Sequence, residues 1–262
     1  MVEELIADLM AETATLGTLV LNLDRGKWDI ATPSPGWTIR DQLTHLAYFD
    51  EALRHALVDP KGFAPLREEV LADVDAYVAG VARTHRHLTG PQVLAWLHRA
   101  RSDLVVEART HAPRERVPWF GPDMSVASAL TSRIMETWAH GQDVFDALGA
   151  RRRPTDRLRH IAFLGHRAMR HSFAAHGLPV PETDVRVELE APTGTTWTFG
   201  PADAPDIVWG TAEDFCLVVT QRRHVADTSL TAVGMVATKW LTIAQAYAGP
   251  PGAGRRAGQF PT

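Results

Sequence analysis

Apolar residues recur at helical spacing through the first 150 residues of the chain. Five segments have the length and the periodicity of helices, each of about 20 residues. We expect these helices at residues 3–23, 38–57, 67–88, 92–111 and 126–149. Because the polar connections between them are short, the pattern predicts an antiparallel helical bundle.

Local signals mark the ends of two of these helices. Thr38 follows the breaker PSPGW and is suited to cap a helix, with Asp41 giving an acidic first turn where a capping box would have Glu or Gln. Ser125 is suited to cap the helix at 126–149, and Gly149 stands where a helix-ending glycine is expected. These two helices carry the candidate chemistry.

The pattern changes after the basic, proline-containing segment ARRRPTD. A further helix is expected at 156–178, a β-hairpin around PTG at 184–200, a short strand at 206–210, and helices at 211–223 and 237–249. The fold class is therefore mainly α with a small α+β C-terminal domain. We expect a helical bundle at 1–150, the α+β domain at 151–249, and a disordered Pro/Gly-rich tail at 250–262.

Composition narrows the function classes. The chain has 262 residues, of which 45% are hydrophobic and 22% charged, with a formal net charge of −4, as in soluble globular proteins. The chain has no excess of Lys and Arg, so its charge gives no support to nucleic-acid binding. The single cysteine, Cys216, excludes an internal disulfide and a Cys-rich zinc site, and its apolar surroundings predict a buried side chain. The acidic N-terminus is unlike a signal peptide and no apolar run reaches the ~18 residues of a membrane span, so we expect a cytoplasmic protein without a membrane partner.

The segment ETWAHGQDV places a carboxylate and an imidazole on one face of the last bundle helix. Glu136 and His140 are i and i+4. His45, on the flank of an apolar stripe in the second helix, is the best candidate for a third ligand. Together they would give the His2Glu set of a catalytic zinc, with one position left open. Each signal also has an ordinary interpretation, a solvated Glu/His pair and a core histidine.

Asp143 lies three residues after His140 and is suited either to bind a metal or to orient a ligand imidazole from behind. An ordinary charged residue near the end of the helix is the alternative. Trp37 and Trp138, beside the two motifs, are interpreted as packing residues.

Two segments resemble a known family. GWTIRDQLTHLAYFDEAL resembles the second-helix motif of the DinB-like four-helix-bundle metalloproteins, and METWAHGQDVFDALG is similar to the signature of their actinobacterial subgroup typified by mycothiol-dependent maleylpyruvate isomerase. The resemblance covers residues 1 to about 150 and extends more loosely to the C-terminal part. It implies a DinB-like antiparallel four-helix bundle followed by a sterol-carrier-like α+β domain.

The resemblance also implies roles for particular residues. His45, Glu136 and His140 would bind a divalent metal, with zinc as the expected ion. In the isomerase, an arginine in a Leu-x-Gly-Arg-type step helps catalysis. The matching segment here is LVVTQRR, where Gln221 replaces the glycine, so Arg222 is the implied catalytic residue and Arg223 an alternative. The departure at Gln221 leaves the isomerase reaction itself open.

Three functions follow from these observations. The first is a metal-dependent enzyme, either a transferase or a cis–trans isomerase. It would activate a low-molecular-weight thiol such as mycothiol for addition to a small electrophilic substrate. An arginine would bind a carboxylate of that substrate. The second is a hydrolase or lyase in which metal-bound water attacks a small molecule without a thiol. The third is a non-catalytic metal- or small-molecule-binding protein. Either a monomer or a homodimer is compatible with the pattern.

Overall fold

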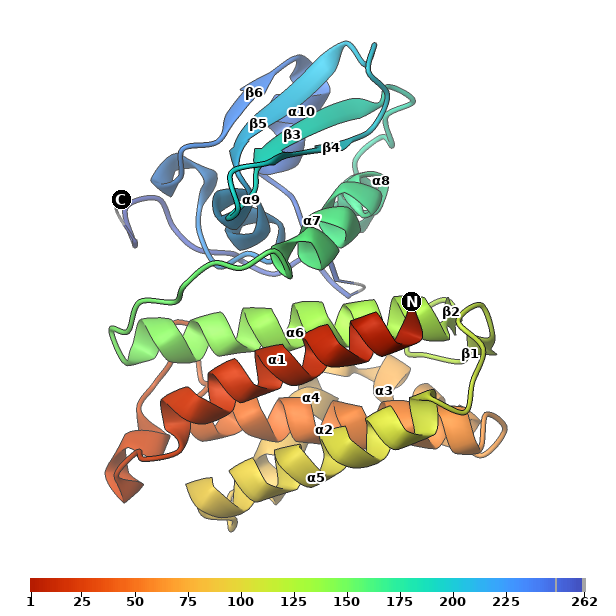
Figure 1. Cartoon of the computed structure of the whole chain (residues 1–262), viewed down its shortest axis with the longest axis vertical. Coiled ribbons are helices and arrows are strands. Elements are labelled where there is room, and N and C mark those ends of the chain that lie inside the picture. Colours follow the sequence, from red (N-terminus) through yellow and green to blue (C-terminus); the bar gives the residue numbers. More distant parts are fainter. Residues whose placement is uncertain (248, 261–262) are drawn as a thin grey trace. The chain divides into compact units, whose positions relative to one another are not determined.

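The computed structural model describes residues 1–247 and 249–260. These fall into two compact units, which divide between residues 152 and 153. The predicted fold class is confirmed: the first unit is a helical bundle and the second is an α+β unit (Figure 1). Of the predicted disordered tail, residues 261–262 lie outside the described residues. None of the described helices is long and apolar enough to cross a membrane.

Four long helices build the bundle: α1 (Val2–Val20), α2 (Ile39–Val58), α5 (Gly90–Ala108) and α6 (Val126–Ala147). Helix α2 packs against both α5 and α6, and α1 packs against α6 and α5. The starts of α1 and α6 share one apolar cluster with the ends of α2 and α5, so the first pair runs opposite to the second (Figure 1).

The caps predicted for α2 and α6 form as expected. Thr38 caps α2, and Asp41 completes a full capping box by accepting from the backbone of Thr38, so Asp fills the role usually taken by Glu or Gln. Ser125 caps α6 through the backbone N–H of Ser128, and Gly149 adopts a φ of 60° just after the helix.

The helix predicted at 67–88 is wrong as a single element. It is two short helices, α3 (Ala64–Ala72) and α4 (Val74–Thr84). Asp73 adopts an extended conformation, which interrupts the helix. Its side chain then caps α4 by accepting a hydrogen bond from the backbone N–H of Ala76. These two helices connect α2 to α5, which lets α2 and α5 run in the same direction.

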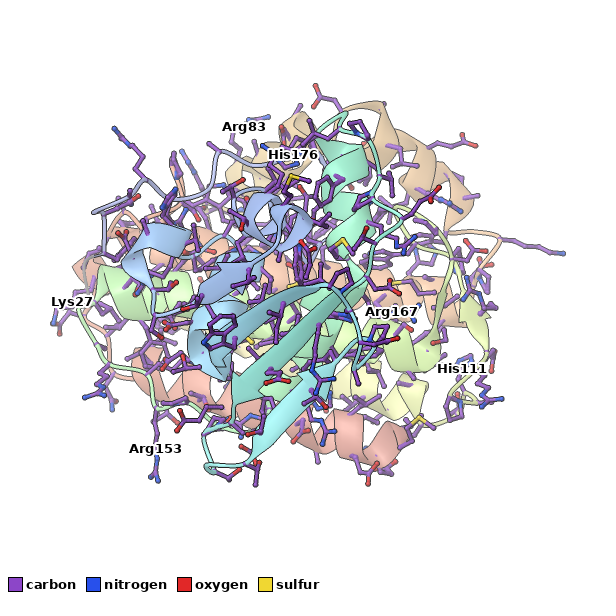
Figure 2. The ribbon with its side chains drawn as sticks, turned by 90° about the horizontal axis from the view of Figure 1, so that it is seen from above. Lys27, Arg83, His111, Arg153, Arg167 and His176 are labelled. Atoms are coloured by element: carbon purple, nitrogen blue, oxygen red, sulfur yellow. The ribbon has the colours of Figure 1, made fainter. Side chains whose placement is uncertain are left out.

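Two apolar clusters fill the bundle core, one toward each end. The first includes Leu9, Leu53, Leu104 and Ile134. The second includes Leu16, Leu43, Leu97 and Val144. Between them, the four helices contribute buried polar residues: Thr13, Asp50, Arg101, Arg133 and Thr137. Most other charged side chains are at the surface, as Figure 2 shows for Lys27 and Arg83. The polar layer in mid-bundle therefore needs its own explanation.

The second unit contains a four-stranded sheet in the order β4-β3-β5-β6. Its strands are β3 (Val185–Glu190), β4 (Thr196–Phe199), β5 (Asp206–Thr211) and β6 (Thr231–Val233). The predicted hairpin is the antiparallel pair β3–β4, and β3 pairs in parallel with β5. Alternate residues such as Val185, Val187 and Leu189 are buried on one face. The strand β6 and a small two-stranded ribbon in the first unit, β1 (Arg116–Val117) with β2 (Met124–Ser125), were not predicted.

Three helix predictions in this unit need correction. The helix expected at 156–178 is divided into α7 (Leu158–Arg167) and α8 (Met169–Ala175) at Ala168, whose N–H donates to the carbonyls of Leu164 and Gly165 in a tightened turn. The helix expected at 211–223 is α9 (Ala212–Val219), which ends before a left-handed residue, Gln221.

The helix expected at 237–249 is only α10 (Met235–Leu241). The chain leaves the helical path after Leu241, and the N–H of Ala246 donates to the carbonyl of Val219 at 2.7 Å instead of continuing a helix. Cys216 of α9 is buried as predicted, and burial raises the pKa of its thiol well above the usual value. It therefore behaves as a small core residue.

Candidate metal centre

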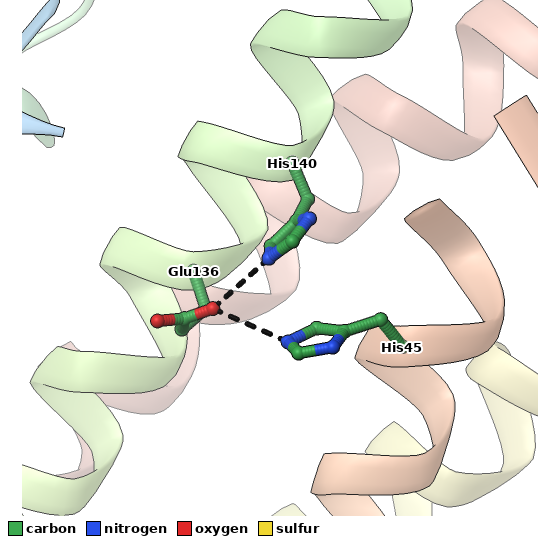
Figure 3. A group of neighbouring side chains, drawn as sticks. All are labelled: His45, Glu136 and His140. Carbon is green, nitrogen blue, oxygen red and sulfur yellow. Dashed lines mark hydrogen bonds and ion pairs between the residues drawn. The ribbon is translucent and has the colours of Figure 1, made fainter. Parts of the chain in front are cut away.

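The structure brings His45, Glu136 and His140 together inside the bundle. The ligand atoms of the three residues all lie within 4.8 Å of one another. One carboxylate oxygen of Glu136 lies 3.1 Å from Nε2 of His140 and 3.5 Å from Nε2 of His45, and Figure 3 shows both contacts meeting at that oxygen. His45 comes from α2 and the other two from α6.

The separations suit a small divalent ion. A tetrahedral zinc with ligand bonds of about 2.0–2.1 Å has ligand-to-ligand edges of about 3.4 Å. The two contacts to Glu136 bracket this value. The three side chains keep 12–23% of their surface exposed, so the cluster is not sealed from solvent. Three ligands with access for a fourth group are typical of a catalytic site.

The ionisation states also suit a metal. Burial is the main cause that lowers the pKa of His45, to about 4, and the neighbouring His140 lowers it further. For Glu136, burial acts to raise the pKa, but hydrogen bonds from His140 and His45 prevail and hold it well below the usual value. At neutral pH the cluster therefore offers a neutral imidazole and a carboxylate, the forms that bind metals.

Gln42 determines which nitrogen of His140 faces the cluster. Its side-chain oxygen lies 2.5 Å from Nδ1 of His140, so Nδ1 carries the proton and donates it. The amide nitrogen of Gln42 donates to Thr32 at 2.8 Å, which fixes the amide orientation. Nε2 of His140 then faces the carboxylate of Glu136 at 3.1 Å. Two facing lone pairs repel unless a proton or a cation lies between them, and a divalent ion would satisfy both.

Asp143 stands behind this cluster rather than in it. Its carboxylate accepts from the hydroxyl of Ser34 at 2.9 Å and lies 3.5 Å from the amide nitrogen of Gln42. The contacts form a chain from Asp143 through Gln42 to His140. This arrangement corresponds to the orienting role considered for Asp143, carried by an intermediate glutamine.

The breaker PSPGW forms part of the wall of the cluster. Gly36 adopts a φ of 80°, which returns the chain toward α2. Trp37 stacks on His140 with 5.6 Å between ring centroids and lies 5.4 Å from His45. Trp37 therefore packs, as interpreted, but on the candidate ligands themselves. Trp138 is buried elsewhere in the bundle, under the guanidinium of Arg152.

Sequence reasoning missed Gln42, Ser34 and Thr32. Gln42 precedes His45 by three residues, and the i, i+3 rule would have placed it on the same face of α2. Ser34 and Thr32 lie in an irregular loop, where spacing carries no such information.

Arg222 and Arg223 lie in the second unit, just after α9. Gln221 before them has a φ of 60°, the one positive value among described residues other than glycine. The N–H of Gln221 donates to Val218 and that of Arg222 to Leu217, the two bonds of a Schellman ending. Gln221 thus occupies a position that favours glycine.

Together, the fold and the cluster define a class: a helical bundle with a His/His/Glu cluster on two of its helices, followed by an α+β unit. A family model described as the mycothiol maleylpyruvate isomerase N-terminal domain matches residues 9–145, more than half of the chain. The chain belongs to this family, and the resemblance seen in its motifs is confirmed. A second model, described as wyosine base formation, matches only residues 181–233.

Relatives extend the similarity over both units. Two uncharacterised proteins of Mycobacterium tuberculosis, from strain H37Rv and strain CDC 1551 / Oshkosh, are each 44% identical over 250 residues, which cover 95% of this chain and 97% of theirs. The crystal structure of a mycothiol-dependent maleylpyruvate isomerase matches with a TM-score of 0.57 at 17% identity, and that of its histidine-to-alanine mutant with 0.59 at 16%. Both matches cover 88% of this chain and 92% of the isomerase, and they show a shared fold.

Proposed function

We propose that this protein binds a divalent metal, with zinc as the expected ion, through His45, Glu136 and His140. We propose further that it activates a low-molecular-weight thiol of the mycothiol type for addition to a small electrophile. The observation that carries the proposal is the convergence of three donor atoms with the proton of His140 held on the far nitrogen by Gln42.

The metal-binding residues have separate roles. Glu136 supplies the negative charge and the oxygen shared by both histidine contacts. Gln42 keeps the lone pair of His140 directed at the cluster. Trp37 covers both imidazoles with an apolar ring. When bound, a divalent ion would lower the pKa of a coordinated thiol or water and so supply a nucleophile near neutral pH.

Membership of the family supports a thiol as the nucleophile. The thiol gives its proton to solvent to form a thiolate. The sulfur then forms a bond to the electrophilic carbon while the π bond, or the bond to a leaving group, at that carbon breaks. In a transferase the new S–C bond persists and the substrate carbon or leaving group takes up the charge. In an isomerase the same bond breaks after rotation and the thiol is released unchanged.

Arg222 is the residue that we assign to a substrate carboxylate. Gln221 occupies a left-handed position that favours glycine, which supports Arg222 as the counterpart of the arginine that the resemblance implies. Arg223, the alternative, places its guanidinium over the ring of Phe260 at 4.0 Å. A guanidinium is suited to bind a carboxylate through two parallel hydrogen bonds.

The first test is the metal content of untagged protein by mass spectrometry. We expect about one equivalent in the wild type and in His87→Ala, which removes an exposed histidine of the same unit, and none in His140→Ala. Absence of metal from the wild type, even after reconstitution with zinc, would overturn the proposal.

A second test separates the thiol enzyme from the thiol-independent hydrolase or lyase. Mycothiol at 100 times its Kd should stabilise the zinc-loaded protein by about 2.7 kcal/mol, whereas S-methylated mycothiol should not. Zinc binding without any protection by mycothiol would favour the reaction of metal-bound water.

A further inference from the structure

A buried network of charged residues ties the four bundle helices together beside the cluster. Asp50 of α2 accepts from Arg101 of α5 at 2.5 Å and from Arg133 of α6 at 2.9 Å. Arg101 also donates to Thr13 of α1 at 2.8 Å and to Thr137 of α6 at 3.0 Å. The three charged side chains are at most 4% exposed.

Stability alone does not explain this network. Two guanidinium groups share one carboxylate, so the network carries an excess positive charge in the core. Replacing buried ion pairs by apolar residues of similar volume is often neutral or stabilising, because the burial of charge is costly. Burial accordingly lowers the pKa of Arg101 despite the adjacent Asp50. A core of leucines would close the gap between the two apolar clusters at lower cost.

Arg133 is the member that contacts the turns bearing the candidate ligands. It precedes Glu136 by three residues on α6, so the two lie about one helical turn apart. Its Nη2 donates to the carbonyl of Leu46, the residue after His45 on α2, at 3.3 Å. Its own carbonyl accepts from Thr137, the residue after Glu136, at 2.6 Å. Arg101 makes no hydrogen bond to the backbone of α2.

We propose that Arg133 is a positioning residue that fixes the α2 turn carrying His45 against the α6 turn carrying Glu136 and His140. Asp50 holds the guanidinium of Arg133 in place for this task, through the hydrogen bond that it accepts at 2.9 Å. The consequence for metal binding rests on the proposed function. The geometric claim does not, because it concerns the spacing of side chains in the metal-free protein.

Such a tie is needed because the ligands come from two separate helices. Glu136 and His140 keep their spacing through the backbone of α6, but His45 depends on how α2 lies against α6. A metal site tolerates errors of only about 0.5 Å in the placement of its ligands. Apolar side chains alone permit sliding and repacking on that scale, whereas a bidentate guanidinium has a fixed shape.

The test compares Arg133→Met with the matched control Arg101→Met. Each variant removes one buried guanidinium and leaves Asp50 with one arginine partner, so charge and lost volume are equal. Only Arg133→Met breaks the bond to Leu46. The first measurement uses metal-free protein and records the ring nitrogen and proton NMR signals of His45 and His140.

We expect Arg133→Met to shift the His45 signals and Arg101→Met to leave them near their wild-type positions. The second measurement is zinc affinity by competition with a chromophoric chelator. We expect Arg133→Met to weaken binding 10- to 100-fold and Arg101→Met to weaken it less than threefold. Equal effects of the two substitutions on both measurements would overturn the proposal.

The two proposals fail in different ways. A wild type that binds no zinc, with His45 signals that still move only in Arg133→Met, would remove the proposed function and leave the positioning role. Zinc binding by the wild type, with no difference between the two variants, would support the proposed function and remove the positioning role of Arg133. If Arg133→Met does not fold, Arg133→Lys decides, because a lysine pairs with Asp50 but has no second arm for Leu46. Unchanged His45 signals in Arg133→Lys would then overturn the inference.

Discussion

Gln42→Leu is expected to weaken zinc binding without unfolding the bundle. Leucine is apolar and somewhat shorter than glutamine, and it cannot accept the proton of His140, which Gln42 accepts at 2.5 Å. The imidazole of His140 is then free to carry a proton on Nε2, where the proton would bond to Glu136 and compete with a metal. Loss of such an orienting partner typically lowers metal affinity 10- to 100-fold, which corresponds to about 1.4–2.7 kcal/mol.

Gln142→Leu is the matched control. Gln142 is a glutamine of α6 that is only 6% exposed, and its amide donates to Asp146 at 2.9 Å rather than to the cluster. Zinc affinity is measured by chelator competition, and the nitrogen signals of His140 in metal-free protein report its tautomer. If Gln42→Leu binds zinc as tightly as Gln142→Leu, or if His140 keeps its proton on Nδ1, the tautomer argument is wrong.

Two further predictions concern the second unit. Gln221→Val should lower the free energy of unfolding of the second unit by about 1–2 kcal/mol relative to Gln221→Gly, because a β-branched residue is strained at a φ of 60°. Urea unfolding of both variants measures the difference. Burial lowers the pKa of His166 below the unfolded value of about 6.5, although its bond to Val185 opposes the shift. The unfolded state therefore binds the proton more readily, and stability should fall as the pH drops below about 6.5; a similar pH dependence in His166→Gln would contradict this.

Periodicity predicted the long helices because each buries a continuous apolar stripe. Helices α2 and α6 begin directly after their caps at Thr38 and Ser125, and they end within two residues of the predicted ends at 57 and 149. It failed where one polar residue redirects the chain without disturbing the apolar pattern. Asp73 is such a case, since both α3 and α4 bury residues in phase with a single longer helix.

The same limit applies to the candidate site. The spacing of Glu136 and His140 on one helix is local and could be read directly. His45 was chosen among the other histidines for its place on the flank of an apolar stripe, and the family resemblance agreed. That α2 brings it to Glu136 and His140 depends on tertiary packing, which local spacing does not contain. The support for His140 comes from a glutamine and a loop serine whose importance appears only when the chain is folded. Sequence patterns therefore named the three side chains that the fold brings together, and missed the glutamine and the loop residues that contact them.

The polar layer between the two apolar clusters allows stability and function to be separated. We expect the combined substitution of Asp50→Leu, Arg101→Met and Arg133→Met to leave the melting temperature unchanged or higher, because it removes all three buried charges together and strands none. The hydroxyls of Thr13 and Thr137 keep partners, since each donates to the carbonyl four residues earlier.

Zinc affinity should nevertheless fall at least tenfold in this triple variant, because nothing then fixes the His45 turn against α6. Calorimetry and chelator competition on the same preparation measure both effects. A triple variant that unfolds would show that the network is required for the fold itself. A triple variant that is stable and binds zinc like the wild type would show that apolar packing alone places His45. The buried charges would then have no role in the site.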